Sequence, residues 1–296
     1  MLHARQVRIL FFSRTVLTRG ICNIAWRIQP ISLPSRLSPS NNRFSTQSPH
    51  PSTMSSSSSP KKPLSSQLDN PPPSMRRLVD FYDPGTKGAD AKGRTLDTIL
   101  AWPDAELERC HDYIQTVFPL PEASGVSSSA PILEAATVEL FRRTPELQAR
   151  VRDMFVRMLS FYGFDTEVGD DHLGVTIIII PSKDRFKAQR GYARWVKWGD
   201  HNHLRITRII RSLRVLGLGD AARSFYDAVR TVQTQKGGSA ISRTSIEYFT
   251  RASEWDLQYT PDGSAEIPWL VGFEEKMERE LKKLEEQEEG QERSED

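Results

Sequence analysis

DHNHLRITRIIRSLRVL, at residues 200–216, is the segment from which the fold class can be inferred. Each residue of a helix turns by about 100°, so the apolar side chains of this segment gather on one side. Arginines occupy the opposite half, and Asp200 is a suitable N-cap. The pattern therefore predicts an amphipathic helix that faces a core. Its apolar stripe contains Ile206, Ile209, Ile210, Leu213 and Leu216, and its opposite half carries Arg205, Arg208, Arg211 and Arg214.

The same helical spacing recurs across most of residues 75–249. One run of β-favouring residues, VTIIII at 175–180, predicts a strand that ends at Pro181. We therefore expect a mainly α fold, a compact multi-helix domain with at most a small β element. Further helices are expected over 103–118, with His111 on the apolar stripe, over 145–162, and over 183–197 with Phe186 and Trp195 as inward anchors.

The charges divide the chain into three parts. Residues 1–68 carry seven Arg and two Lys without any acid, whereas residues 274–296 carry eleven acids against five bases. The segment between them is close to neutral. We expect a basic, Ser/Pro-rich and disordered arm and linker at 1–74, a helical domain at 75–255, and a linker with an acidic C-terminal helix and tail at 256–296. The thin stripe of that terminal helix is Phe273, Met277, Leu281 and Leu284.

The first 29 residues mix arginines with short apolar runs and contain no acid, which is typical of a mitochondrial transit peptide. Residues 41–46, NNRFST, offer a processing site with Arg43 ahead of small polar residues. We therefore expect a mitochondrial location. The alternative is that translation begins at Met54, ahead of a serine tract, which leaves a nuclear, perinuclear or cytoplasmic location open.

Composition excludes several classes of protein. Two cysteines, Cys22 and Cys110, exclude a disulfide scaffold and a four-cysteine zinc site. No apolar run reaches the 18 residues of a membrane-spanning helix. The basic excess lies in the arm rather than the domain, so we expect no nucleic-acid partner. No phosphate-binding loop or nucleophile elbow occurs, and we expect no cofactor.

The arginines of residues 205–214 have two interpretations. They form a solvated cationic face, or Arg205 and Arg208 belong to an anion site near the start of the helix. There a positive charge opposes the helix dipole and needs another reason to be present.

The histidines also have two interpretations. His201 and His203 are two positions apart, which is unfavourable for a shared metal on a helix, and buried structural histidines are the default expectation. His111 sits between Cys110 and Asp112, but adjacent helical residues diverge and cannot form a nucleophile–base relay. The competing hypothesis is an enzyme whose pocket brings His111, His201 and His203 together.

Six short motifs occur in order along the chain: GRTLDTILAW at 93–102, HDYIQ at 111–115, FP at 118–119, AP at 130–131, FYG at 161–163 and HNHLRITRI at 201–209. On these motifs the chain resembles the opioid growth factor receptor conserved domain family over roughly residues 75–253. The resemblance departs at Thr116-Val117, where the family usually has Trp-Leu, so a groove lined by that aromatic would be altered.

This resemblance implies a receptor for an enkephalin-type peptide with a peripheral, nuclear or perinuclear membrane association, and no catalytic residue carries over. Together with the arginine helix it predicts a non-enzymatic, monomeric domain that binds a peptide, a small anionic ligand or a protein partner. The candidate ligand-binding residues are His201, Asn202, His203, Arg205, Arg208, His111, Tyr113 and Trp102.

Overall fold

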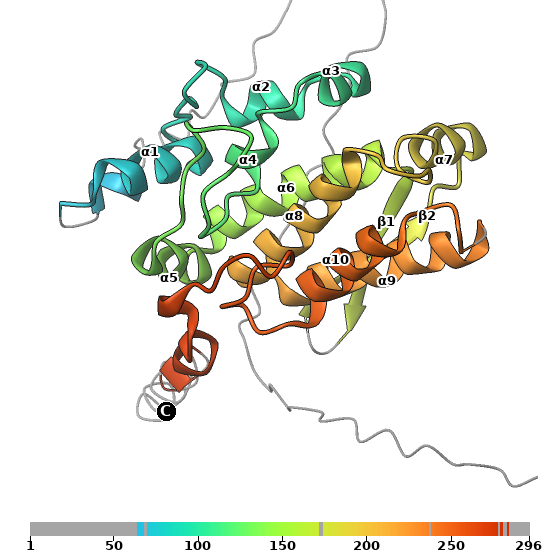
Figure 1. Cartoon of the computed structure of the whole chain (residues 1–296). Coiled ribbons are helices and arrows are strands. Elements are labelled where there is room, and N and C mark those ends of the chain that lie inside the picture. Colours follow the sequence, from blue (N-terminus) through green and yellow to red (C-terminus); the bar gives the residue numbers. More distant parts are fainter. Residues whose placement is uncertain are drawn as a thin grey trace, which may run out of the picture. The chain divides into compact units, whose positions relative to one another are not determined.

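A computed structural model describes residues 64–67, 70–171, 174–236, 238–277, 279–280 and 283. Within these residues the fold is mainly α with one two-stranded sheet, which confirms the predicted fold class (Figure 1). Residues 1–63 of the arm and linker predicted over 1–74, which include the targeting segment, lie outside the described residues, whereas residues 64–67 of it form a short helix. The helices are α1 (Pro73–Tyr82), α2 (Leu96–Leu100), α3 (Asp104–Arg109), α4 (Ile114–Val117), α5 (Ala135–Arg143), α6 (Pro145–Phe161), α7 (Arg185–Tyr192), α8 (Asn202–Val215), α9 (Gly219–Gln235) and α10 (Arg243–Glu254).

Helix α8 lies among α4, α6, α9 and α10 and packs along α9 and α10 (Figure 1). All five residues of its predicted apolar stripe are fully buried. Burial does not stop at that stripe, because Arg205 and Arg211 are only 5% and 2% exposed. The helix is therefore enclosed on its polar side as well, and the expected solvated cationic face is wrong for these two residues.

A β-hairpin follows α6. Strand β1 (Phe164–Asp171) pairs antiparallel with β2 (Gly174–Pro181), and Phe164 lies opposite Pro181. The predicted strand at 175–180 is confirmed, whereas β1 was not expected because FDTEVGDD has few β-branched residues. A strand needs a partner for its backbone hydrogen bonds, and the adjoining segment supplies it.

The helix expected over 103–118 is instead two short helices, α3 and α4, separated by residues 110–113. In this connection Asp112 accepts hydrogen bonds from the Arg94 guanidinium at 3.0 and 3.3 Å and pairs with Lys92 at 3.0 Å. His111 is exposed, so its expected place on an apolar stripe is wrong. The expected helix is interrupted because these side-chain contacts hold residues 110–113 in a non-helical conformation.

The helix expected over 183–197 ends at Tyr192. Trp195 is fully buried and donates its indole N–H to the Tyr162 carbonyl oxygen at 3.1 Å, as expected of an inward anchor. Phe186 is 72% exposed, so its expected inward position is wrong. It follows Asp184, whose carboxylate accepts the Phe186 and Lys187 amides, and this cap fixes the start of α7.

The core extends past residue 255. Leu257, Leu270, Phe273 and Met277 are all buried in the same hydrophobic cluster, the second of them in the 3-10 helix η2 (Pro268–Leu270). The first half of the predicted C-terminal stripe therefore packs onto the domain, and Leu281 and Leu284 lie outside the described residues. At the other end, η1 (Leu64–Gln67) contacts α1. The domain boundaries at 74 and 255 stay predictions.

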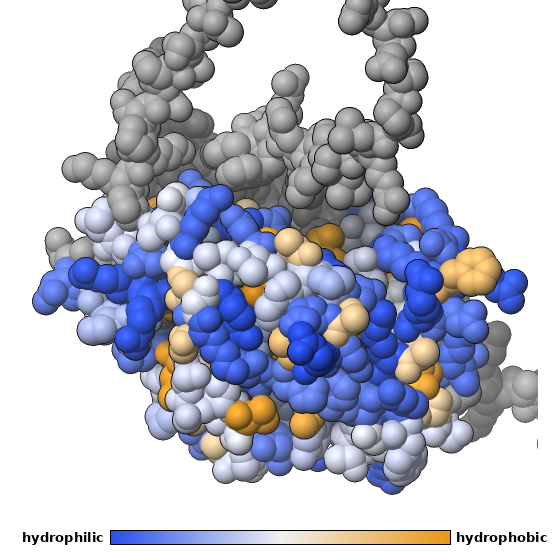
Figure 2. Space-filling model, turned by 90° about the horizontal axis from the view of Figure 1, so that it is seen from above, coloured by the Kyte–Doolittle hydropathy of each residue, from blue (hydrophilic) through white to orange (hydrophobic). Residues whose placement is uncertain are grey.

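One face of the molecule is largely hydrophilic, with apolar side chains in small separate patches (Figure 2). Among the described residues, no helix has the length and apolar character needed to cross a membrane.

The approach of α7 to the end of α6 depends on glycine at position 191. A Cβ added there would lie 2.2 Å from the Gly163 backbone nitrogen, and Gly163 itself has φ +92°. We expect Gly191→Ala to lower the free energy of unfolding by about 3 kcal/mol, because backbone atoms cannot move aside as a flexible side chain does. Chemical denaturation measures this.

Gly219→Ala is the matched control, since an added Cβ meets nothing within 4 Å at that position in the first turn of α9. Equal stability of the two variants would contradict the close packing of α7 on α6.

Candidate functional site

Arg205 closes the end of α3. Its guanidinium donates to the carbonyl oxygens of Leu107 at 3.0 Å and Cys110 at 2.7 Å, with a longer contact to Glu108 at 3.4 Å. The last carbonyls of a helix have no partner within the helix and carry its negative dipole end. The arginine that opposes the dipole of α8 therefore stabilises the C-terminus of α3.

Two other arginines of α8, Arg208 and Arg214, also donate to helix ends. Arg208 donates to the Phe118 carbonyl, which ends α4, at 2.9 Å. Arg214 donates to the Ala252 and Trp255 carbonyls at the end of α10, at 2.9 and 2.8 Å.

Arg211 combines a carbonyl with a carboxylate. It donates to the Tyr259 carbonyl at 2.9 Å and to both carboxylate oxygens of Glu122 at 2.8 and 3.2 Å. The cationic row thus ties three helix ends and two loops to α8.

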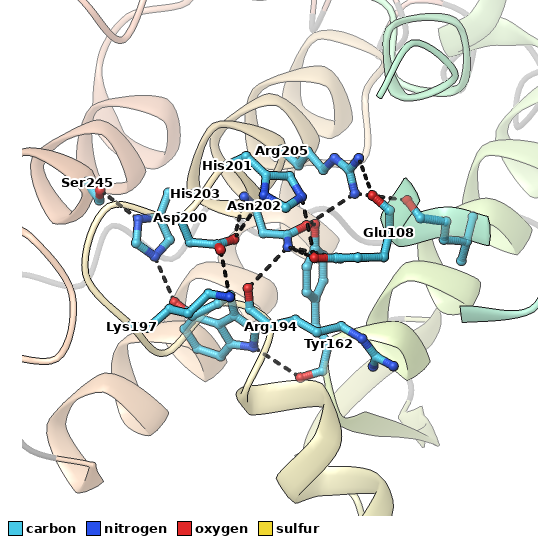
Figure 3. A network of polar contacts seen from close by, with 12 residues as sticks. Glu108, Tyr162, Arg194, Lys197, Asp200, His201, Asn202, His203, Arg205 and Ser245 are labelled. Carbon is cyan, nitrogen blue, oxygen red and sulfur yellow. Dashed lines mark hydrogen bonds and ion pairs between the residues drawn. The ribbon is translucent and has the colours of Figure 1, made fainter. Parts of the chain in front are cut away.

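Asn202 organises the start of α8 (Figure 3). Its amide donates to Glu108 at 3.2 Å and to the Arg194 carbonyl at 3.1 Å, and its oxygen accepts from Arg205 at 3.3 Å. The N-cap residue is His201, so the prediction of Asp200 as N-cap is wrong by one position, although the Asp200 carboxylate still accepts the Asn202 backbone N–H at 2.8 Å. Burial alone would raise the pKa of Asp200, but that bond and the contact with Lys197 outweigh burial and lower it. Fully buried, Asn202 is a structural residue.

His203 is buried and bonded through both ring nitrogens. Its Nε2 lies 2.7 Å from the Trp195 carbonyl oxygen, and its Nδ1 lies 2.9 Å from the Ser245 hydroxyl (Figure 3). Because a carbonyl can only accept, Nε2 carries the hydrogen and Nδ1 accepts from Ser245. Burial lowers the pKa of this imidazole. The expectation of a buried structural histidine is confirmed for His203 and is wrong for His201, which is exposed.

His111 and His201 do meet, with ring centroids 5.0 Å apart. His201 also lies 3.5 Å from Glu108 and 3.6 Å from Asp200, and burial lowers its pKa. His203 takes no part, since Trp195 and Ser245 occupy both of its nitrogens. The pocket of three histidines is therefore not formed, and the described residues contain no cluster suited to a metal ion.

A cavity of about 590 Å³ opens beside these histidines. It is bounded by α4, α8, α10 and two loops, at 120–126 and 260–265. Of the eight predicted site residues, His111, His201, Arg205 and Arg208 line it.

The remaining four predicted site residues, Asn202, His203, Tyr113 and Trp102, lie outside the cavity lining. Trp102 and Tyr113 form an edge-to-face pair at 5.5 Å, with Arg94 over the first ring and Arg205 over the second. Tyr113 is fully buried, so this pair belongs to the core.

Sequence reasoning missed several lining residues. Glu122, Tyr248 and Asp262 all face the cavity, from the first loop, α10 and the second loop. The sequence marks Arg211 only as a member of the cationic row on α8. That row is the one sequence feature that indicates a cavity-lining residue beyond the predicted set. The cavity exists because two loops distant in sequence close over α8, and no local pattern marks them.

Comparison with known proteins gives the family. The sequence profile of the opioid growth factor receptor conserved region matches residues 85–254, more than half of the chain. The chain belongs to this family. The match contains α2 to α10, the cavity-lining part of α8 and the first of the two loops. The resemblance seen in the sequence is thereby confirmed.

Curated relatives in the opioid growth factor receptor family match part of the chain. The human opioid growth factor receptor is 38% identical over 159 residues, covering 52% of this chain and 22% of that protein. The opioid growth factor receptor-like protein 1 of Xenopus tropicalis is 34% identical over 112 residues, covering 38% of this chain and 20% of that protein. The matched region thus spans about a fifth of each relative. No solved structure matches the chain significantly.

Because His203 is buried, the stability of the folded domain should depend on pH. The pKa of His203 is lowered in the folded protein, so the unfolded chain, with an ordinary pKa near 6.5, binds the proton first. The free energy of unfolding therefore has its full value above a pH of about 6.5. It decreases as the pH falls through and below that value, because the unfolded chain takes up the proton. Urea denaturation at a series of pH values should show this decline, and His203→Gln should flatten it.

His201→Gln is the comparison, because that side chain is 41% exposed and protonation costs less there. A slope unchanged by His203→Gln would contradict the assignment.

Proposed function

We propose that this member of the opioid growth factor receptor family is a non-catalytic receptor domain whose cavity beside α8 binds a short peptide or a small anionic molecule. The human relative is named a receptor and the Xenopus tropicalis relative a receptor-like protein, which supports a binding role. The observation that carries the proposal is Arg208, a largely buried cation that lines the cavity.

The size of the cavity suits such a ligand. Sites for small molecules and peptide side chains commonly enclose about 300–1,000 Å³ and combine apolar walls with a few placed polar groups. Here Ile114, Leu120 and Leu204 supply apolar surface, and the guanidinium of Arg208 supplies the polar group.

A catalytic role has less support. The His111–His201 pair is the only remnant of the three-histidine hypothesis among the described residues, and neither ring is paired with a nucleophile there. Mitochondrial targeting by the N-terminal arm and a peripheral membrane association also remain proposals, because they rest on residues outside those described and on the family resemblance.

Binding of an enkephalin-type pentapeptide to the full chain, measured by isothermal titration calorimetry, tests the proposal. We expect Arg208→Gln to weaken binding by about tenfold or more, because a hydrogen bond to a charged group contributes about 1.5–3 kcal/mol. Arg243→Gln is the matched control, as its side chain is 93% exposed and lies outside the cavity.

Thermal unfolding of both variants checks that they fold. An affinity unchanged by Arg208→Gln, or failure of the wild-type chain to bind the peptide, would contradict the proposal.

A further inference from the structure

The four guanidinium groups on α8 are not equally satisfied. Arg205 has carbonyl and amide acceptors on two elements, Arg211 has a carboxylate and a carbonyl, and Arg214 has two carbonyls. Among the described residues, Arg208 has one hydrogen bond, from Nη1 to the Phe118 carbonyl oxygen. A guanidinium has five N–H donors in a planar fork, so the edge formed by Nε and Nη2 is left for another acceptor.

Arg208 is also poorly compensated electrostatically. Burial lowers its pKa to about 10, and the nearby carboxylate of Glu122 opposes this only in part. That carboxylate is already engaged by Arg211 through both oxygens. A largely buried cation without a carboxylate partner is unfavourable, and an incoming anion that reached its free edge would relieve this.

The charges around the cavity limit how negative that anion can be. Three arginines line it, Arg205, Arg208 and Arg211, together with the acidic residues Glu122 and Asp262. Hydrogen bonds from Thr260 and Ser264 lower the pKa of Asp262, which keeps it ionised.

His201 is neutral near pH 7, because burial lowers its pKa. His111, exposed at the other side of the pair, faces the cavity from the connection before α4. The fixed charges therefore leave a surplus of one positive charge, enough for a monoanion and unfavourable for a phosphate dianion.

The aliphatic side chains that line the cavity indicate which kind of molecule carries the anionic group. Ile114 and Leu120 line the cavity, and Leu204 and Val126, also in the lining, are 62% and 69% exposed. Large aliphatic side chains left open at a cavity mouth favour an apolar body, since covering them removes apolar surface from water.

We infer that the cavity selects a single carboxylate carried on an apolar body, such as the C-terminal apolar residue of a peptide, with the free edge of Arg208 as its partner. This inference rests on the proposed function and narrows its ligand class. The planar carboxylate accepts two parallel N–H bonds from Nε and Nη2, and the apolar residue next to it covers Leu204 and Leu120. The negative charges of Glu122 and Asp262 make binding of a phosphate dianion unfavourable.

The test compares two probes that differ only in charge. N-acetyl-leucyl-phenylalanine as the free acid and as its C-terminal amide are titrated into the full chain by calorimetry. Inorganic phosphate is the competitor, at a mildly alkaline pH where it is mainly the dianion. We expect the acid to bind at least about tenfold more tightly than the amide, in line with a charge-assisted hydrogen bond, and phosphate not to compete.

Variants then test whether Arg208 is responsible for the preference for the acid over the amide. Arg208→Gln should bind acid and amide equally, Arg208→Lys should keep part of the preference, and the control Arg243→Gln should keep all of it. Because the comparison of acid with amide is made first in the wild-type chain, it does not depend on the folding of any variant.

The outcomes separate this inference from the proposed function. Equal binding of acid and amide, or competition by phosphate, overturns the inference and leaves a receptor cavity in place. Binding of the enkephalin-type peptide without binding of either dipeptide also overturns it. If no peptide probe binds, the proposed function fails together with the inference.

Discussion

Guanidinium-to-carbonyl hydrogen bonds from α8 hold this domain together. Helices α3, α4 and α10 end against α8, and each end presents carbonyls that lack partners within its own helix. Arg205, Arg208 and Arg214 supply the donors. The C-terminus of α8 is also held by an arginine. Arg142 from α5 donates to the Arg214 and Val215 carbonyls at 3.1 and 3.0 Å. A helix with an arginine at every third position can therefore be buried on both sides.

The cavity is a consequence of the same arrangement. Arg208 and Arg211 reach from α8 to the end of α4 and to the loop at 120–126, and these elements line the cavity. Most of the guanidinium donors of α8 are used for support. Arg208 is the exception, with one carbonyl bond and a free edge, and for this reason we propose it, rather than the supporting arginines next to it, as the ligand's partner.

The sequence predicts the helices best where one apolar face is continuous, as in α6 and α8. It fails where side chains distant in sequence decide the local structure. Asp112 and Arg94 break the helix expected through His111, and β1 forms because β2 needs a partner. Four of the eight predicted site residues line the cavity, since they share the start of α8 or the connection packed against it. Glu122, Tyr248 and Asp262 could not be predicted, because only the tertiary fold brings their loops and helix together.

Native-state hydrogen exchange of Arg205→Lys, read by mass spectrometry, tests the supporting role of α8 most directly. An ammonium cannot span the carbonyls of Leu107 and Cys110 as the planar fork does. Amides of residues 104–118 should lose protection to a greater extent than those of α9, and Arg243→Lys should leave both unchanged. Equal loss of protection in α9 and in residues 104–118, or no loss in either, would contradict the account.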